Sequence, residues 1–417
     1  MQSRERAILV GSGPKRREWE LRSTLDELTS LAETSHAIPV EKVLQFRGRK
    51  DPSWLIGRGK AEEISKMVEE KQIDLVIFDQ ELSPAQLRNL ESLIPCKVID
   101  RTQLILDIFA QRARTKEGKI QVELAQLQYM LPRLAGKGKE MSRLGGGIGT
   151  RGPGEKKLET DRRHIRRQIR LLTKQLEGIK KHRQLHQEHR KKNRIPQVAL
   201  VGYTNAGKST LLNQLTGAEV LAENQLFATL DPTSRLLVLP SGKEVILTDT
   251  VGFIRQLPHH LVAAFRSTLE HVREADLLLH VIDASHPEAE EQIEAVEQVL
   301  ASLEASNIPA LKVWNKTDLF SGAVPKQCGG ENLFVSAFSE TDLERLKEKI
   351  GQLLQEDMVT GQVEIPVMRG DWISLLHHKA EMIESNADEL MMSIRFRLSH
   401  ADFERLPAEL RNRIQIR

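Results

Sequence analysis

The chain carries a loop with glycines at both ends between a strand-like and a helix-like segment. Residues 202–209 have the spacing G-x-x-x-x-G-K-S, after the apolar run 198–201 and before the helix-forming run 211–215. The backbone N–H groups of such a loop point at phosphate oxygens, and the following helix adds its partially positive N-terminus. This context predicts an open α/β sheet that binds a nucleotide at the carboxyl ends of its strands.

Each residue of this loop has an expected role. Lys208 is expected to reach the β- and γ-phosphates, which makes it a candidate catalytic residue, and the Ser209 hydroxyl is expected to ligate Mg²⁺. The other loop residues are expected to contact the nucleotide, and they are Gly202, Tyr203, Thr204, Asn205, Ala206 and Gly207.

A second motif predicts which base is bound. A polar quartet follows the apolar run 308–314, and it consists of Asn315, Lys316, Thr317 and Asp318. The Asp318 carboxylate can accept hydrogen bonds from guanine N1–H and from the exocyclic amine, a donor pair that adenine lacks. A site built on such bonds can reject the wrong partner by roughly 10⁴-fold. After the next short strand come residues suited to backbone contact with the guanine O6, namely Ser336, Ala337 and Phe338.

Two segments between these motifs, a first switch segment at residues 227–231 and a second switch segment at residues 249–252, are expected to sense the γ-phosphate. One is an apolar strand that ends in Asp-x-x-Gly, with the residues Asp249, Thr250, Val251 and Gly252. Asp249 is expected to hold Mg²⁺ through water, and the Gly252 N–H to approach the γ-phosphate. The other segment consists of Phe227, Ala228, Thr229, Leu230 and Asp231. Thr229 is preferred over Thr233 as the second hydroxyl ligand to Mg²⁺ and as a catalytic candidate. Together these elements predict a Ras-like P-loop GTPase domain with a mixed sheet.

The residue after Asp-x-x-Gly predicts slow intrinsic hydrolysis. In Ras-like GTPases a glutamine at this position orients the attacking water, whereas this chain has Phe253. A phenyl ring cannot position water, and the sequence identifies no general base. Assistance accelerates Ras by roughly 10⁵-fold, so we expect a partner to complete or order this site.

Composition narrows the class of protein. The 417 residues suffice for two or three domains, and a formal net charge of +3 does not by itself indicate nucleic-acid binding. Cys96 and Cys328 are the only cysteines, which disfavours a disulfide framework. Residues 1–6 lack the apolar core of a signal peptide, and no apolar run approaches the roughly 20 residues of a membrane span. We therefore expect a cytoplasmic protein without a membrane span, and separately we expect a monomer.

Residues 1–115 predict an N-terminal α/β domain with a mostly parallel sheet. Strand-like runs at 7–10, 43–46, 74–78 and 97–99 alternate with helix-like runs at 18–35, 60–71 and 83–93. Gly11 and Gly13 suggest a dinucleotide fingerprint, but Arg16 occupies the third glycine position, so a simple turn is favoured. The GTPase domain is expected over 196–355. A small α+β domain is expected over 356–417, with strands at 362–367 and 390–398 around a helix at 372–385.

Residues 116–195 predict a helical hairpin. Apolar residues recur at alternating spacings of four and three from Ile120 to Leu134 and again from Leu158 to Ile179, although Pro132 should kink or shorten the first helix. The alternative is two amphipathic helices packed on a neighbouring domain.

The rest of this region favours contact with RNA. A glycine-rich loop at 145–155 and an excess of basic residues from 162 to 194 favour RNA contact over a flexible linker and a solvated helix face. His182, His186 and His189 share one helix face, but no carboxylate or cysteine completes a metal site there.

The chain resembles the HflX family of translational GTPases. The resemblance rests on residues 57–60, 114–119, 121–127 and the 145–155 loop, and the GTPase motifs extend it. It implies a Mg²⁺-dependent GTP hydrolase that binds the large ribosomal subunit and its RNA, and that splits stalled or idle ribosomes in its GTP state. The alternatives are a GTP-regulated RNA-binding factor in ribosome assembly or RNA modification, and an RNA-binding scaffold with residual GTP affinity. The C-terminal domain varies within the family, so the resemblance assigns it no role.

Overall fold

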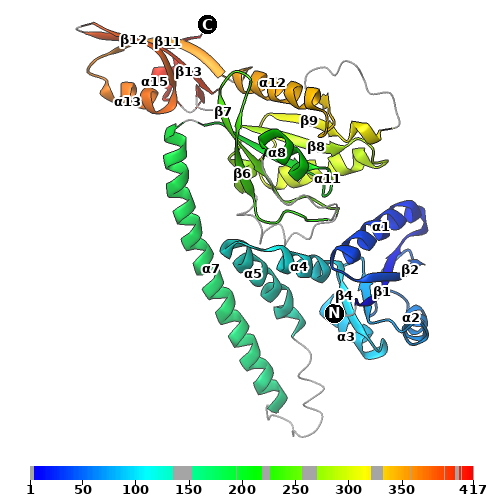
Figure 1. Ribbon diagram of the computed structural model, residues 1–417. Coiled ribbons are helices and arrows are strands. Elements are labelled where there is room, and N and C mark those ends of the chain that lie inside the picture. Colours follow the sequence, from blue (N-terminus) through cyan, green and yellow to red (C-terminus); the bar gives the residue numbers. More distant parts are fainter. Residues whose placement is uncertain are drawn as a thin grey trace.

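The described chain forms three sheets and a pair of long helices (Figure 1). A computed structural model describes residues 4–134, 153–193, 195–217, 226–255, 270–320, 332–356, 358–388, 390–399, 403–404 and 406–416. Within these residues no helix is long and apolar enough to cross a membrane. Cys96 is not in a disulfide, and Cys328 lies outside the described residues.

The first sheet is entirely parallel, with the order β2-β1-β3-β4. Its strands are β1 (Arg6–Gly13), β2 (Ile38–Phe46), β3 (Leu75–Phe78) and β4 (Lys97–Asp100). Its helices are α1 (Glu18–Thr34), α2 (Arg58–Lys71), α3 (Pro84–Leu93) and α4 (Arg101–Arg112), and a short 3₁₀ turn η1 (Lys15–Arg17) precedes α1. The predicted N-terminal α/β fold is thus confirmed.

One local expectation in this region is wrong, and one helix was not predicted. Gly11 and Gly13 lie within β1 rather than in a turn, because β1 pairs with β2 as far as Phe46. Helix α4 was not expected, and its sequence shows why: residues from Leu104 to Phe109 are buried almost all round, so the amphipathic period is weak.

The helical pair follows this sheet. Helix α5 (Lys116–Arg133) packs along α7 (Pro153–Asn193), and Figure 1 shows them side by side and antiparallel. Their seam holds the apolar repeat of the sequence, namely Ile120, Leu124, Leu127, Ile169, Leu172, Leu176 and Ile179. Pro132 lies in the last turn of α5, which ends one residue later.

The loop between these helices differs from the expectation at its end. Residues 153–155 begin α7, since proline is favoured in the first turn of a helix. Residues 145–152 and the side chains of His182, His186 and His189 lie outside what the structure describes.

The central sheet is mixed, as predicted, with the order β10-β9-β8-β5-β7-β6. Its strands are β5 (Gln197–Gly202), β6 (Thr233–Val238), β7 (Glu244–Asp249), β8 (Leu277–Asp283), β9 (Ala310–Asn315) and β10 (Asn332–Phe334), of which β6 alone is antiparallel to its neighbour. The helical segments are α8 (Lys208–Thr216), α10 (Glu270–Arg273), α11 (Ala289–Ser302), η2 (Thr317–Leu319) and α12 (Glu340–Glu356).

The last sheet is antiparallel, with the order β12-β13-β11-β14. It contains β11 (Met358–Pro366), β12 (Glu381–Ala387), β13 (Met391–Ser399) and β14 (Gln415–Ile416), with helices α13 (Gly370–Lys379) and α15 (Ala408–Arg411). The expected helix at 372–385 is wrong beyond Lys379. Residues from Glu381 form an edge strand because backbone pairing with β13 overrides their local helix propensity.

Candidate nucleotide-binding site

The phosphate loop connects β5 to α8 at the centre of the mixed sheet. Gly207 adopts φ 95°, and a Cβ there would lie 2.3 Å from Asn315 Nδ2. The position therefore requires glycine on two grounds, backbone conformation and space. The Asn315 amide uses that space to donate to the Ala206 carbonyl oxygen at 3.0 Å, which ties the loop to the polar quartet.

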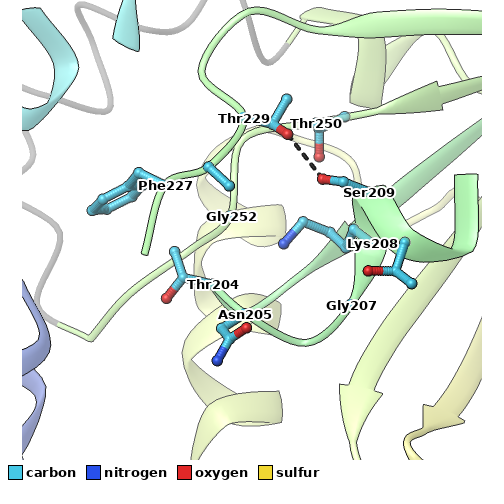
Figure 2. A pocket seen from close by; sticks show the side chains of 11 residues that line it. Thr204, Asn205, Gly207, Lys208, Ser209, Phe227, Thr229, Thr250 and Gly252 are labelled. Carbon is cyan, nitrogen blue, oxygen red and sulfur yellow. Dashed lines mark hydrogen bonds between the residues drawn. The ribbon is translucent and has the colours of Figure 1, made fainter. Parts of the chain in front are cut away.

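A pocket that is open to solvent lies in front of this loop (Figure 2). The loop and both predicted switch segments line it, with the residues Thr204, Asn205, Gly207, Lys208, Ser209, Thr210, Phe227, Ala228, Thr229, Thr250 and Gly252. Three segments that are separate in sequence thus face one space, beside the N-terminus of α8. That arrangement is suited to binding phosphate groups.

Lys208 is buried at the wall of this cavity. Its ammonium donates to the carbonyl oxygens of Gly202 at 3.1 Å and Tyr203 at 2.8 Å. Burial lowers the pKa of Lys208 to about 8, although the neighbouring Asp249 carboxylate opposes this shift. The Lys208 ammonium therefore stabilises the loop to which it belongs through these two hydrogen bonds.

Two hydroxyls and one carboxylate converge beside Lys208. Ser209 Oγ and Thr229 Oγ1 lie 2.9 Å apart, and both donate to Asp249 Oδ2, at 2.6 and 3.0 Å. Burial raises the pKa of Asp249, while Lys208 and both hydroxyls lower it. The other carboxylate oxygen, Oδ1, is buried and has no hydrogen-bond partner among the residues that the structure describes. Oxygen atoms of these kinds are the ligands that Mg²⁺ prefers, so the group fits a magnesium site.

The structure also separates the two threonine candidates. Thr229 turns its hydroxyl toward Ser209, as Figure 2 shows. Thr233 instead begins β6, where it pairs with Asp249 through the sheet register. No group of three or more His, Cys, Asp or Glu side chains that could hold a metal occurs among the described residues.

The expected base-binding residues meet at the carboxyl ends of β9 and β10. Ala337 N–H donates to Asn315 Oδ1 at 3.2 Å, and Ser336 Oγ donates to Asp318 Oδ1 at 2.6 Å. Thr317 begins η2, the Asp318 side chain is exposed, and Phe338 is 75% exposed. The side chains are thus near enough to form one base-binding surface.

Sequence reasoning missed a carboxylate next to this surface. Asp283, the last residue of β8, forms an ion pair with Lys316 at 2.6 Å. Its second oxygen accepts from the Ser285 N–H at 3.0 Å and from the Ser285 hydroxyl at 2.6 Å. Asp283 therefore orients Lys316, and its position at the end of an apolar strand was the available signal.

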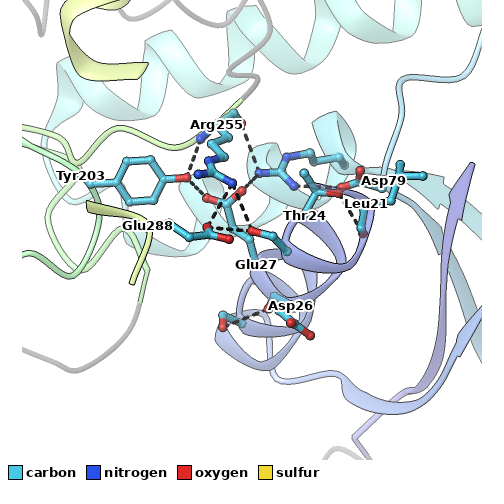
Figure 3. A network of polar contacts seen from close by, with 11 residues as sticks. Leu21, Thr24, Asp26, Glu27, Asp79, Tyr203, Arg255 and Glu288 are labelled. Atoms are coloured by element: carbon cyan, nitrogen blue, oxygen red, sulfur yellow. Dashed lines mark hydrogen bonds and ion pairs between the residues drawn. The ribbon is translucent and has the colours of Figure 1, made fainter. Parts of the chain in front are cut away.

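Sequence reasoning also missed a polar network between the phosphate loop and the N-terminal domain (Figure 3). The Tyr203 hydroxyl donates to the Glu27 carboxylate, and burial followed by the Glu27 charge raises the pKa of Tyr203. Arg101 lies between Glu27 and Asp79, 2.9 Å from the latter. Burial alone would lower the pKa of Arg101, but these two carboxylates hold it above its usual range.

The network continues into the segment after Gly252. Arg255 Nη1 lies 3.0 Å from Glu288 Oε2, and it donates to Ser23 Oγ at 3.1 Å. Ser23 in turn donates to Glu288 at 2.7 Å. Helix α1 is therefore bonded to both the phosphate loop and the segment after Gly252.

Phe253 takes no part in the cavity. Its side chain is 1% exposed and belongs to the large core that joins the N-terminal sheet domain, α5 and the GTPase domain. Its backbone N–H donates to the Gly202 carbonyl oxygen at 3.1 Å, and its carbonyl accepts from Thr204 N–H at 2.7 Å. The ring cannot orient a water molecule from this position.

Comparison with known proteins gives matches along most of the chain. Residues 22–110 match a family described as GTP-binding GTPase N-terminal, residues 112–190 its middle region, and residues 197–316 a family described as 50S ribosome-binding GTPase. The GTPase HflX of Caldanaerobacter subterraneus is 51% identical over 97% of this chain and 93% of its own length. The GTPase HflX of Escherichia coli is 43% identical over 92% and 91%.

Among solved structures, a GTP-binding protein from Sulfolobus solfataricus in complex with GDP is similar. It is 27% identical, the alignment covers 84% of this chain and 99% of that one, and the TM-score is 0.45.

Proposed function

The chain belongs to the HflX family of GTPases, and on this premise we propose that it is a ribosome-dependent switch that separates stalled or idle ribosomes into subunits. Its reaction is the hydrolysis of GTP to GDP and phosphate. In this proposal residues 1–115 and 116–195 form the N-terminal domain and the ribosome-binding hairpin. Residues 196–355 form the GTPase domain and 356–417 an appendage, and the protein acts in the cytoplasm as a monomer.

The nucleotide is proposed to bind along one path across the sheet. Its phosphates enter the cavity before α8, where the loop N–H groups and Lys208 bind the β- and γ-phosphates. Its guanine reaches the carboxyl ends of β9 and β10, where Asp318 accepts from N1–H and the exocyclic amine. Lys316, oriented by Asp283, lies against the base.

The oxygen cluster is proposed to hold Mg²⁺. Ser209 and Thr229 would be direct ligands through their hydroxyls, and Asp249 would bind through water. The bound ion would neutralise charge on the β- and γ-phosphates. The unpartnered Asp249 Oδ1 supports this assignment, because a buried carboxylate oxygen without a partner is costly.

Phe253 supports the dependence on a partner. Because its ring lies in the core, this position cannot orient the attacking water. We infer that docking on the large ribosomal subunit orders or completes the site, which makes hydrolysis a consequence of binding.

The proposal for ribosome binding rests on one face of α7. The seam residues of α7 face α5, and basic side chains lie exposed elsewhere on the helix, namely Arg163, Arg166, Arg167, Arg170, Lys174 and Lys181. Acidic residues are fewer over the same turns. An exposed basic stripe of this kind gains affinity for RNA by releasing counterions, and the gain falls as salt rises.

The test is GTP turnover with and without purified large ribosomal subunits over a salt series, with subunit separation followed by sedimentation. Wild-type turnover should rise strongly with subunits, and the rise should fade with salt. Replacement of Arg163, Arg167 and Arg170 with Glu should abolish the rise in turnover and its dependence on salt.

A matched control replaces Arg22, Arg58 and Arg345 with Glu. Like Arg163, these three arginines are exposed, lie on helices and form ion pairs. This variant changes the net charge equally, and it should keep the stimulation. Turnover indifferent to ribosomes in the wild type would reject the proposal in favour of an assembly factor or a scaffold.

A further inference from the structure

One carboxylate of the first switch segment is bonded to the start of α5. Asp231 Oδ2 accepts the backbone N–H groups of Arg114 and Thr115, both at 2.8 Å. Its Oδ1 accepts the Thr115 hydroxyl. Thr115 is also the N-cap of α5, where its hydroxyl oxygen accepts from Gly118 N–H at 2.9 Å. The switch segment thus completes the cap of a helix more than a hundred residues earlier in the chain.

Helix α5 leaves room for this carboxylate. A Cβ on Gly118 would lie 2.3 Å from Asp231 Oδ1. Gly118 stands in the first turn of α5, although glycine is a poor helix former. The close approach of Asp231 gives a physical reason for glycine there, because any larger residue would displace the carboxylate.

The same segment is held at its other end in the nucleotide site. Thr229 bonds to Ser209 and Asp249 in the oxygen cluster, and Leu230 between the two polar residues is 3% exposed in the core. Three consecutive residues therefore face the cavity, the core and α5. A backbone fixed on both sides of Leu230 allows the Thr229 hydroxyl little freedom of position.

We propose that Asp231 is a positioning residue for GTP hydrolysis, which places Thr229 by anchoring the first switch segment to the start of α5. Because α5 packs along α7, a displacement of the helical pair reaches the Thr229 hydroxyl through Thr115 and Asp231. In the other direction, the GTP-bound order of the switch fixes the start of α5. The part of this inference that concerns ribosomes rests on the proposed function, whereas the part that concerns nucleotide binding rests on the GTPase site alone.

The nucleotide part is tested with Asp231→Ala, Asp231→Asn and Gly118→Ala in the full chain. Affinities for GDP and for a non-hydrolysable GTP analogue are measured with and without Mg²⁺. Asp231→Ala should weaken the Mg²⁺-dependent binding of the analogue by about tenfold, as expected for loss of charge-assisted hydrogen bonds. GDP affinity should stay within about twofold, because GDP lacks the γ-phosphate that orders the switch. The analogue affinity of Asp231→Asn, which keeps one acceptor oxygen, should lie between those of wild type and Asp231→Ala.

Gly118→Ala separates positioning from folding. Alanine favours the helix by about 1 kcal/mol over glycine, which offsets part of the loss of the Asp231 contacts, so the variant should fold cooperatively and lose less stability than Asp231→Ala. Its Cβ should nevertheless expel Asp231 and reproduce the loss of analogue affinity. The double variant should be no weaker than Asp231→Ala, because both changes remove one contact. Wild-type analogue affinity in Asp231→Ala or Gly118→Ala would overturn the inference.

The ribosome part compares the stimulation of turnover by large subunits. Asp231→Ala and Gly118→Ala should still bind the subunits, because the basic face of α7 is intact, yet show at least a tenfold smaller stimulation. Full stimulation in both variants would overturn the proposed coupling and leave the proposed function standing. If wild type itself shows no stimulation, the proposed function fails, and the analogue affinities still decide whether Asp231 positions Thr229.

Discussion

The hydroxyl oxygen of Tyr203 accepts the backbone N–H of Arg255 at 2.7 Å, which joins the phosphate loop to the segment after Gly252. The same hydroxyl donates to Glu27 of α1 (Figure 3). Arg101 adds a bond from the N-terminal domain to the Arg255 carbonyl oxygen at 3.2 Å. Tyr203, a side chain of the phosphate loop, therefore contacts both the N-terminal domain and the segment after Gly252.

Removal of this hydroxyl should loosen the contact between domains. Tyr203→Phe leaves the Arg255 N–H and one Glu27 oxygen without this partner, and a buried group that loses its partner costs about 1–3 kcal/mol. We expect a lower free energy of unfolding in denaturant titrations, together with an altered affinity for GTP. Tyr129→Phe is the matched control, since its buried hydroxyl on α5 bonds to Asp100 of the N-terminal domain at 2.7 Å, away from the GTPase domain. The control should lose stability and keep its GTP affinity; equal nucleotide effects in both variants would contradict this prediction.

Thr229 and Thr233 should differ in their effect on Mg²⁺. Thr229→Ala removes a hydroxyl that lies 2.9 Å from Ser209 Oγ, so the Mg²⁺ concentration for half-maximal turnover should rise by about tenfold. Thr233→Ala leaves the cluster intact, and its Mg²⁺ dependence should match wild type. The measurement is steady-state turnover across a Mg²⁺ titration. A shift in Thr233→Ala alone would reverse the assignment of the two threonines.

Asp318→Asn should change the base that is accepted. An amide can donate to the 2-oxo group of xanthine, whereas the carboxylate accepts from the amine of guanine. We expect GTP affinity to fall by at least about a hundredfold and affinity for xanthosine triphosphate to rise. Competition binding with both nucleotides measures the ratio. Thr317→Ser changes a neighbouring side chain without altering the acceptor, and it should keep the preference for GTP.

The parts of the site predicted from sequence are those whose chemistry lies within a short stretch of chain. The phosphate loop and the quartet from Asn315 are recognisable because backbone spacing and a strand context suffice to place their groups. The overall α/β fold followed from the same alternation of apolar runs. The roles of these residues in binding remain predictions that the experiments above can decide.

The contacts between domains could not be predicted from the sequence. Glu27, Arg101 and Glu288 are charged residues of helices or their ends, and each alone is typical of a solvated face. They become buried partners only because α1 and α4 pack against the GTPase domain. The conformation of the β12 residues could not be predicted from local sequence either, since pairing with β13 decides it.

His280 should make stability depend on pH. It lies in β8 between β5 and β9, with 3% of its surface exposed. Burial, with a further contribution from Lys312, lowers the pKa of His280 to about 4, although Glu297 opposes the shift. A histidine in the unfolded chain has a pKa near 6.5, so below this pH the unfolded state binds the proton that the folded state refuses. Stability is therefore complete above about pH 6.5 and is lost as the pH falls toward 4.

Between pH 7.5 and pH 5 this one group should cost about 2 kcal/mol in the free energy of unfolding. That interval lies above the ordinary range of most carboxylates, so they contribute little to the change. Denaturant unfolding of wild type and His280→Leu at both pH values isolates the effect, because the other histidines are common to the two proteins. The difference between the variant and wild type should shift by about 2 kcal/mol in favour of the variant at pH 5. Parallel pH profiles would mean that the imidazole is hydrated or paired in the folded protein.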